Sequence, residues 1–106
     1  MKQYLAIDIG GTAVKLGLVD ERGSVLARAE ESVRFDGYLT PILDTVLAAA
    51  ERFLQAQKME PTQLEGIGVS ATGQIDSRRG VVAGTCGSLP HYIGSPIRAK
   101  LEEKFH

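Results

Sequence analysis

The sequence predicts one α/β domain: three antiparallel strands, a helix, a strand parallel to its neighbour, and a second helix. Three observations support this fold class. The chain has 106 residues, which is the length of one domain or less. Three strand-like segments follow one another across short turns, which favours an antiparallel meander. A segment with helical periodicity then precedes a fourth apolar strand, which favours parallel pairing of that strand.

The first three strands are predicted at residues 2–9, 13–20 and 24–35. In the first, Leu5, Ile7 and Ile9 share one face, and the other face is largely apolar until Asp8. This pattern suits a central strand that is covered on both sides. Glycine-containing segments at 10–12 and 20–23 supply the turns.

The spacing of the apolar residues changes from alternation to a helical period after the third strand. Apolar residues from Leu39 to Leu54 recur at helical spacing, so we expect a helix over about 38–58. Thr40 is the expected N-cap and Pro41 the expected first helical residue, while Pro61 lies beyond the helix and helps to stop it.

The second half begins with the fourth strand, predicted at 64–71 and ended by Thr72 and Gly73. Residues 80–83 are expected to form a small hairpin with residues 74–75. A helix over 95–105 is expected to start with Ser95 as N-cap and Pro96 at the first position.

Composition excludes several classes of protein. The chain has 12 basic and 13 acidic residues, a net charge of -1, and therefore no basic surface suited to nucleic acid or an acidic membrane. Its one cysteine, Cys86, cannot form an intramolecular disulfide. No export signal or membrane-spanning segment is visible. We expect a cytoplasmic protein without nucleic-acid or membrane partners.

The segment that follows the first strand carries the chemistry. Gly10 and Gly11 let the backbone approach a ligand, and consecutive N–H groups there can bind an anion. Thr12 can donate to a phosphate oxygen, Lys15 adds positive charge, and Asp8 can hold Mg²⁺ directly or through water. Together they predict a site for ATP and Mg²⁺. The alternative is a plain hairpin turn with Asp8 at the strand end.

Three stretches resemble the ROK family of sugar kinases and regulators, within the actin, hexokinase and heat-shock chaperone ATPase superfamily. Residues 8–20 resemble its first phosphate motif, and residues 66–73, G-I-G-V-S-A-T-G, resemble one of its strands. Residues 80–82, followed by Leu89-Pro90, Tyr92 and residues 94–97, resemble the run into its second helix. The resemblance covers the whole chain in order.

The resemblance implies an RNase H-like, actin-like ATPase lobe, with residues 1–106 as a truncated N-terminal domain that lacks the fifth strand. Most members are ATP-dependent hexose kinases that act on a hexose or amino sugar with Mg²⁺ and use an Asp as general base. It also implies which residues contact the nucleotide and the sugar. The nucleotide residues are Asp8, Gly10, Gly11, Thr12 and Lys15, and the sugar residues are Thr72, Gly73, Ser88 and Leu89.

Two departures from the family pattern affect the expected activity. The family's general base belongs to a Glu-Asn-Asp motif that would follow His106, so we expect no catalytic residue in this chain and no activity from the chain without its C-terminal lobe. Ser88 stands where the family has an Asn before Leu89-Pro90, and Tyr92 stands where Trp is commoner.

Two alternatives stay open. The chain could be a piece of a sugar-sensing transcriptional regulator of the same family, although its first strand leaves no room for a preceding helix-turn-helix domain. It could also be a non-catalytic, self-associating lobe. Without a fifth strand, strand 64–71 becomes a sheet edge, so we expect a homo-oligomer formed by strand pairing or exchange of the last helix. The opposing expectation is a monomer whose loop at 80–94 covers that edge.

Overall fold

The computed structural model describes residues 2–84, 92 and 94–105. Cys86, Ser88 and Leu89 lie outside the described residues, so the expectations for them stay predictions. The first half contains strands β1 (Gln3–Ile9), β2 (Ala13–Asp20) and β3 (Val25–Ser32), followed by helix α1 (Ile42–Ala56). The second half contains a 3₁₀ turn, η1 (Pro61–Gln63), strands β4 (Gly66–Ala71), β5 (Gln74–Asp76) and β6 (Val81–Gly84), and helix α2 (Ile97–Phe105).

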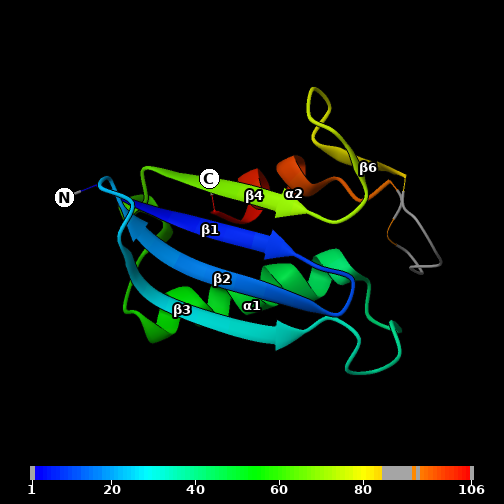
Figure 1. Ribbon diagram of the computed structural model, residues 1–106, viewed down its shortest axis with the longest axis horizontal. Coiled ribbons are helices and arrows are strands. Elements are labelled where there is room, and N and C mark those ends of the chain that lie inside the picture. The colour runs from blue at the N-terminus through cyan, green and yellow to red at the C-terminus, as the bar shows by residue number, and fades with distance from the viewer. Residues whose placement is uncertain (1, 85–91, 93, 106) are drawn as a thin grey trace.

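The main sheet has the strand order β3-β2-β1-β4 (Figure 1). β1 pairs with β2 in antiparallel register from Gln3↔Asp20 to Ile9↔Val14, and it pairs with β4 in parallel register from Tyr4↔Gly66 to Ile9↔Ala71. β2 pairs with β3 in antiparallel register, while β5 and β6 form a separate two-stranded sheet. The predicted fold class is therefore confirmed, including the one parallel pair.

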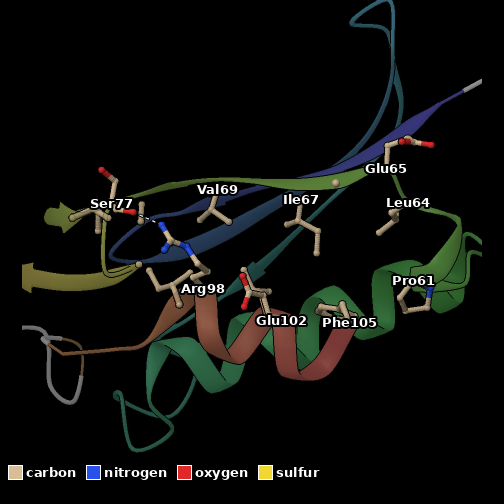
Figure 2. Close-up of a pocket in the computed structure, with 15 residues that line it drawn as sticks. Pro61, Leu64, Glu65, Ile67, Val69, Ser77, Arg98, Glu102 and Phe105 are labelled. Carbon is tan, nitrogen blue, oxygen red and sulfur yellow. Dashed lines mark hydrogen bonds between the residues drawn. The ribbon is translucent and has the colours of Figure 1, made fainter.

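The core lies between the sheet and the two helices, which occupy the same side of the sheet (Figures 1 and 2). Because side chains alternate across a strand, β1 and β2 bury every second residue against α1. The buried sheet residues are Leu5, Ile7, Ile9, Val14, Leu16 and Leu18, and the buried helix residues include Val46, Ala50, Phe53, Ile97, Leu101 and Phe105. No helix in the described part of the chain is long and apolar enough to span a membrane.

The first helix is shorter than predicted at both ends. The Thr40 hydroxyl donates to Asp36 Oδ2 at 2.7 Å instead of capping the helix, so Pro41 is the N-cap and the helix begins at Ile42. At the other end Lys58 has a φ of 55°, and its N–H donates to the Gln55 carbonyl. Met59 N–H donates to the Leu54 carbonyl. These bonds form a Schellman motif, which ends the helix at Ala56.

Two strands also differ from their predicted bounds. β3 ends at Ser32 rather than at residue 35, because its partner strand begins at Ala13, opposite Ser32. β4 begins at Gly66 rather than at residue 64. Leu64 ends the η1 turn, with its N–H donated to the Pro61 carbonyl, and is therefore not paired as a strand residue.

The second helix begins at Ile97, two residues later than predicted. Ser95 does not cap it, because the Ser95 hydroxyl donates to the Tyr92 carbonyl at 2.5 Å. The small hairpin predicted before this helix is present as β5 and β6. Three bonds connect its turn to α2. The Arg98 guanidinium donates to the Ser77 carbonyl and, at 2.8 Å, to the Arg78 carbonyl, and Arg98 N–H donates to the Gly80 carbonyl at 3.1 Å.

Candidate functional site

The turn between β1 and β2 has Gly11 and Thr12 at its tip. Gly10 N–H donates to the Ala13 carbonyl at 2.9 Å and closes the turn. A Cβ atom at Gly10 would lie 2.9 Å from that same oxygen, so a side chain there would force the turn to open. Gly10 is therefore required where the turn closes, and Gly11 and Thr12 form the tip between Gly10 and Ala13.

The two carbonyl groups of this tip accept hydrogen bonds, whereas its two N–H groups donate none to the described part of the chain. The Gly11 carbonyl accepts a hydrogen bond from the Tyr38 hydroxyl at 2.6 Å, and the Thr12 carbonyl accepts one from Val33 N–H at 3.0 Å. Within the described residues, neither Gly11 N–H nor Thr12 N–H has a protein acceptor. Adjacent free N–H groups in a turn can bind an anion.

Charged and polar side chains form a row next to this turn on the sheet face opposite the helices. Asp8 is the register partner of Lys15 on β2 and of Ser70 on β4, and Lys15 is in turn the partner of Glu30 on β3. Register partners project from the same face of a sheet, so the row runs Glu30–Lys15–Asp8–Ser70. All four side chains are exposed, and no ion pair in the described part of the chain involves Asp8 or Lys15.

Asp8 has the right chemistry for Mg²⁺ but would need other ligands. The described residues contain no cluster of three or more His, Cys, Asp or Glu side chains that could form a metal site. Mg²⁺ commonly uses one or two carboxylates together with waters and substrate phosphates. The single exposed carboxylate of Asp8, beside a turn with two adjacent N–H groups, fits that mode of binding.

The turn that follows β4 lies beside the first turn at the same end of the sheet, where β1 and β4 both terminate (Figure 1). Thr72 N–H donates to the Ile9 carbonyl at 2.7 Å, which joins the start of this turn to the end of β1. Gly73 has a φ of 92°, a conformation that side-chain-bearing residues rarely adopt. The structure thus brings two sequence-predicted residues, Thr72 and Gly73, next to Gly10, Gly11 and Thr12.

Two tyrosines hold these turns. The sequence analysis named Tyr92 only as a position of the family pattern and did not single out Tyr38, and it predicted neither of their hydrogen bonds. Tyr38 donates to Gly11, as described above, and Tyr92 donates from its hydroxyl to the Thr72 carbonyl at 2.6 Å. Tyr92 is only 1% exposed, and burial raises the pKa of its hydroxyl. Each tyrosine lies at least 20 residues from its acceptor in sequence, so no local pattern could have indicated either bond.

The loop between β3 and α1, residues 33–41, carries Tyr38 and is held at several points. Val33 is fully buried and bonded to the first turn. Asp36 Oδ2 accepts hydrogen bonds from Thr40 N–H at 3.1 Å and from the Thr40 hydroxyl at 2.7 Å. The bond from the Thr40 hydroxyl is the largest cause of a lowered pKa at Asp36. These bonds hold the loop in one conformation, and through Val33 and Tyr38 the loop in turn holds the turn at residues 10–12.

An apolar groove of about 700 Å³ lies away from these turns, between β4 and α2 (Figure 2). Leu64, Ile67 and Val69 line its β4 side, and Leu101 and Phe105 line its α2 side. None of the described candidate site residues lines it. The candidate chemistry is at the end of the sheet, whereas the groove follows its open edge.

Comparisons with known proteins identify the family and the fold. A family model described as the ROK family matches residues 4–106. A beta-glucoside kinase from Klebsiella pneumoniae is 37% identical over 100 residues, covering 93% of this chain and 30% of its own.

Two solved structures share the fold at lower sequence identity. A ROK family glucokinase from Streptomyces griseus, in complex with glucose and AMPPNP, superimposes with a TM-score of 0.70 at 22% identity, covering 95% of this chain and 30% of that chain. A ROK family transcriptional regulator, a homologue of the E. coli MLC protein, gives a TM-score of 0.72 at 20% identity, covering 96% of this chain and 25% of that chain. The chain spans about a third or less of the length of these relatives.

Proposed function

Because the chain belongs to the ROK family, we propose that it is the N-terminal part of an ATP-dependent hexose kinase. In this proposal it supplies the turn that binds the nucleotide phosphates and Mg²⁺, together with part of the sugar site. The name of the Klebsiella relative, a beta-glucoside kinase, supports the kinase class. The glucokinase that shares the fold was solved with glucose and AMPPNP bound, which supports ATP as the phosphoryl donor.

The observation that carries the proposal is the tip of the turn at residues 10–12. Its two carbonyls accept hydrogen bonds, and its two N–H groups have no acceptor among the residues that the structure describes. In the proposal Gly11 and Thr12 N–H donate to phosphate oxygens, helped by the Thr12 hydroxyl and the Lys15 ammonium group. Asp8 holds Mg²⁺ through water, and bound Mg²⁺ would neutralise charge on the transferring phosphoryl group.

We place the sugar at the neighbouring turn. Thr72 and Gly73, with Ser88 and Leu89 further along the chain, would contact a hexose or amino sugar. The support is proximity: the bond from Thr72 N–H to the Ile9 carbonyl keeps this turn beside the phosphate-binding turn. Transfer needs donor and acceptor close together and in line.

We further propose that this chain lacks the general base and the C-terminal lobe, so the chain alone does not phosphorylate sugars. The whole kinase would act in the cytoplasm, the reducing compartment expected from the single cysteine. Transfer by a kinase requires a positioned base and a cleft that excludes water. The chain alone would therefore bind a nucleotide without turning it over.

Titration of the ¹⁵N-labelled chain with MgATP tests this proposal. We expect the amide signals of Gly11 and Thr12 to shift progressively, while those of the β2–β3 turn, residues 21–24 at the opposite end of β2, stay in place. We also expect no hexose-dependent release of ADP. The Lys15→Met variant should weaken binding, and Lys58→Met, which removes an exposed charge at the end of α1, is the matched control. Unmoved Gly11 and Thr12 signals at saturating MgATP would rule out the nucleotide role.

A sugar-sensing regulator is the second candidate, because a regulator of the same family shares this fold. The two candidates differ in the use of ATP. A kinase piece responds to MgATP at the first turn, whereas a chain that responds to a hexose and not to MgATP would favour the regulator.

A further inference from the structure

The peptide between Gly11 and Thr12 is oriented by a residue outside the turn. The Tyr38 hydroxyl donates to the Gly11 carbonyl at 2.6 Å. In a trans peptide the carbonyl and the following N–H point in opposite directions, and the described residues contain no cis peptide bond. Holding the Gly11 carbonyl toward Tyr38 therefore directs Thr12 N–H away from Tyr38.

The backbone at Tyr38 supports a specific role for this bond. Tyr38 has a φ of 66°, and the preceding Gly37 has a φ of 69°. A bulky residue in the left-handed region is uncommon, and such conformations persist only where the surroundings impose them. The surroundings here include Asp36, bonded to Thr40, and Val33, bonded to Thr12. The loop is thus fixed on both sides of Tyr38.

We propose that Tyr38 is a positioning residue of the turn at residues 10–12. Its hydroxyl fixes the Gly11–Thr12 peptide so that Thr12 N–H stays available to an anionic phosphate ligand. This inference rests on the proposed phosphate-binding function of the turn. Tyr38 itself touches no ligand in this proposal, since its one role is to hold a carbonyl group.

The test compares Tyr38→Phe with Tyr4→Phe in the labelled chain. Both variants lose one phenolic hydroxyl, but the Tyr4 hydroxyl has no hydrogen-bond partner within the described residues, so Tyr4→Phe is the matched control. The first measurement needs no ligand. The Gly11 carbonyl carbon and the Thr12 amide should shift or broaden in Tyr38→Phe and stay in place in Tyr4→Phe. Unchanged Gly11 and Thr12 signals in Tyr38→Phe would overturn the proposal.

The second measurement is titration with inorganic tripolyphosphate and Mg²⁺. Loss of one hydrogen bond that orients a donor should weaken binding by about two- to tenfold in Tyr38→Phe and leave Tyr4→Phe equal to the wild type. Equal affinity in Tyr38→Phe would overturn the proposal even if the ligand-free signals move. If the wild type binds neither tripolyphosphate nor MgATP, the proposed phosphate-binding function fails, and the ligand-free measurement still decides whether Tyr38 fixes the peptide.

Discussion

β1 and β4 are parallel neighbours with similar apolar sequences, yet they differ sharply in burial. Ile7 and Val69 are register partners. Ile7 is 2% exposed, whereas Val69 is 39% exposed. β1 has a strand on each side and α1 against its inner face, while β4 has a strand on one side and a groove between it and α2. An apolar strand sequence therefore does not determine burial, because burial depends on what lies on either side.

The largest expected effect tests this difference in the core. Ile7→Ala should lower the free energy of unfolding by about 2–5 kcal/mol, the usual cost of truncating a buried aliphatic side chain. Val69→Ala should lower it by less than about 1 kcal/mol, because Val69 is already partly in water. Urea unfolding of both variants measures the two values. Equal losses would mean that something covers β4 in solution.

The second prediction compares Asp8 and Ser70, the polar residues near the ends of β1 and β4. In a kinase that includes this chain, Asp8→Ala should lower turnover by two orders of magnitude or more. Losing a carboxylate that anchors Mg²⁺ removes roughly 3 kcal/mol of transition-state stabilisation. Ser70→Ala, at the register partner of Asp8, is the control and should stay within a few-fold of the wild type. Near-normal turnover of Asp8→Ala at saturating Mg²⁺ would mean that Asp8 does not anchor Mg²⁺ and only ends the strand.

The two edges of the sheet give a third test. β3 carries Arg28, Glu30 and Glu31, whereas β4 carries no charged residue, and no strand in the described part of the chain pairs with its outer side. An apolar unpaired edge is prone to pair with a second copy. We therefore expect a dimer whose mass falls toward 11.4 kDa in Val69→Lys.

Val25→Lys, at a valine on β3 that is 50% exposed against 39% for Val69, should leave the dimer intact. Light scattering across a hundredfold dilution measures both variants. A wild-type mass of 11.4 kDa at every concentration would contradict self-association.

The smallest effect concerns the loop that supports the first turn. The hydrogen bond from the Thr40 hydroxyl holds the pKa of Asp36 below its ordinary value of 3.8. A pKa that is lower in the folded state contributes stability above the unfolded value and loses it as the pH falls through the folded value.

Thr40→Val should therefore raise the pKa of Asp36 toward 3.8. The stability of the loop should then fall less as the pH is lowered. Carbon-detected NMR titration of the Asp36 carboxyl measures this change, with Thr62→Val, an exposed threonine in η1, as control. An unchanged Asp36 pKa in Thr40→Val would mean that other donors hold the carboxylate.

Local sequence patterns predicted much of this fold. Alternation in residues 3–9 and helical spacing from Ile42 to Leu54 depend on near neighbours, and both patterns correspond to observed elements. Element ends were less predictable, because they depend on competing bonds. Thr40 had the sequence of an N-cap, but its hydroxyl bonds to Asp36.

The candidate site shows the same division. Asp8, Gly10, Gly11, Thr12 and Lys15 could be proposed as site residues because they lie within eight residues of one another. Tyr38 was missed, because its bond to Gly11 spans 27 residues and follows from how the loop packs. Residues that present chemistry can be found in the sequence, whereas residues that hold them in place require the fold.

The parallel pairing of β1 and β4 also limits how the two turns can evolve. Ile9 and Ala71 are register partners, so the two turns begin one strand spacing apart, about 4.8 Å. Backbone hydrogen bonds set that separation, and side-chain substitutions leave it unchanged. Point mutations can therefore alter which groups a ligand meets at the two turns, whereas a different spacing between those groups would require residues to be inserted or removed.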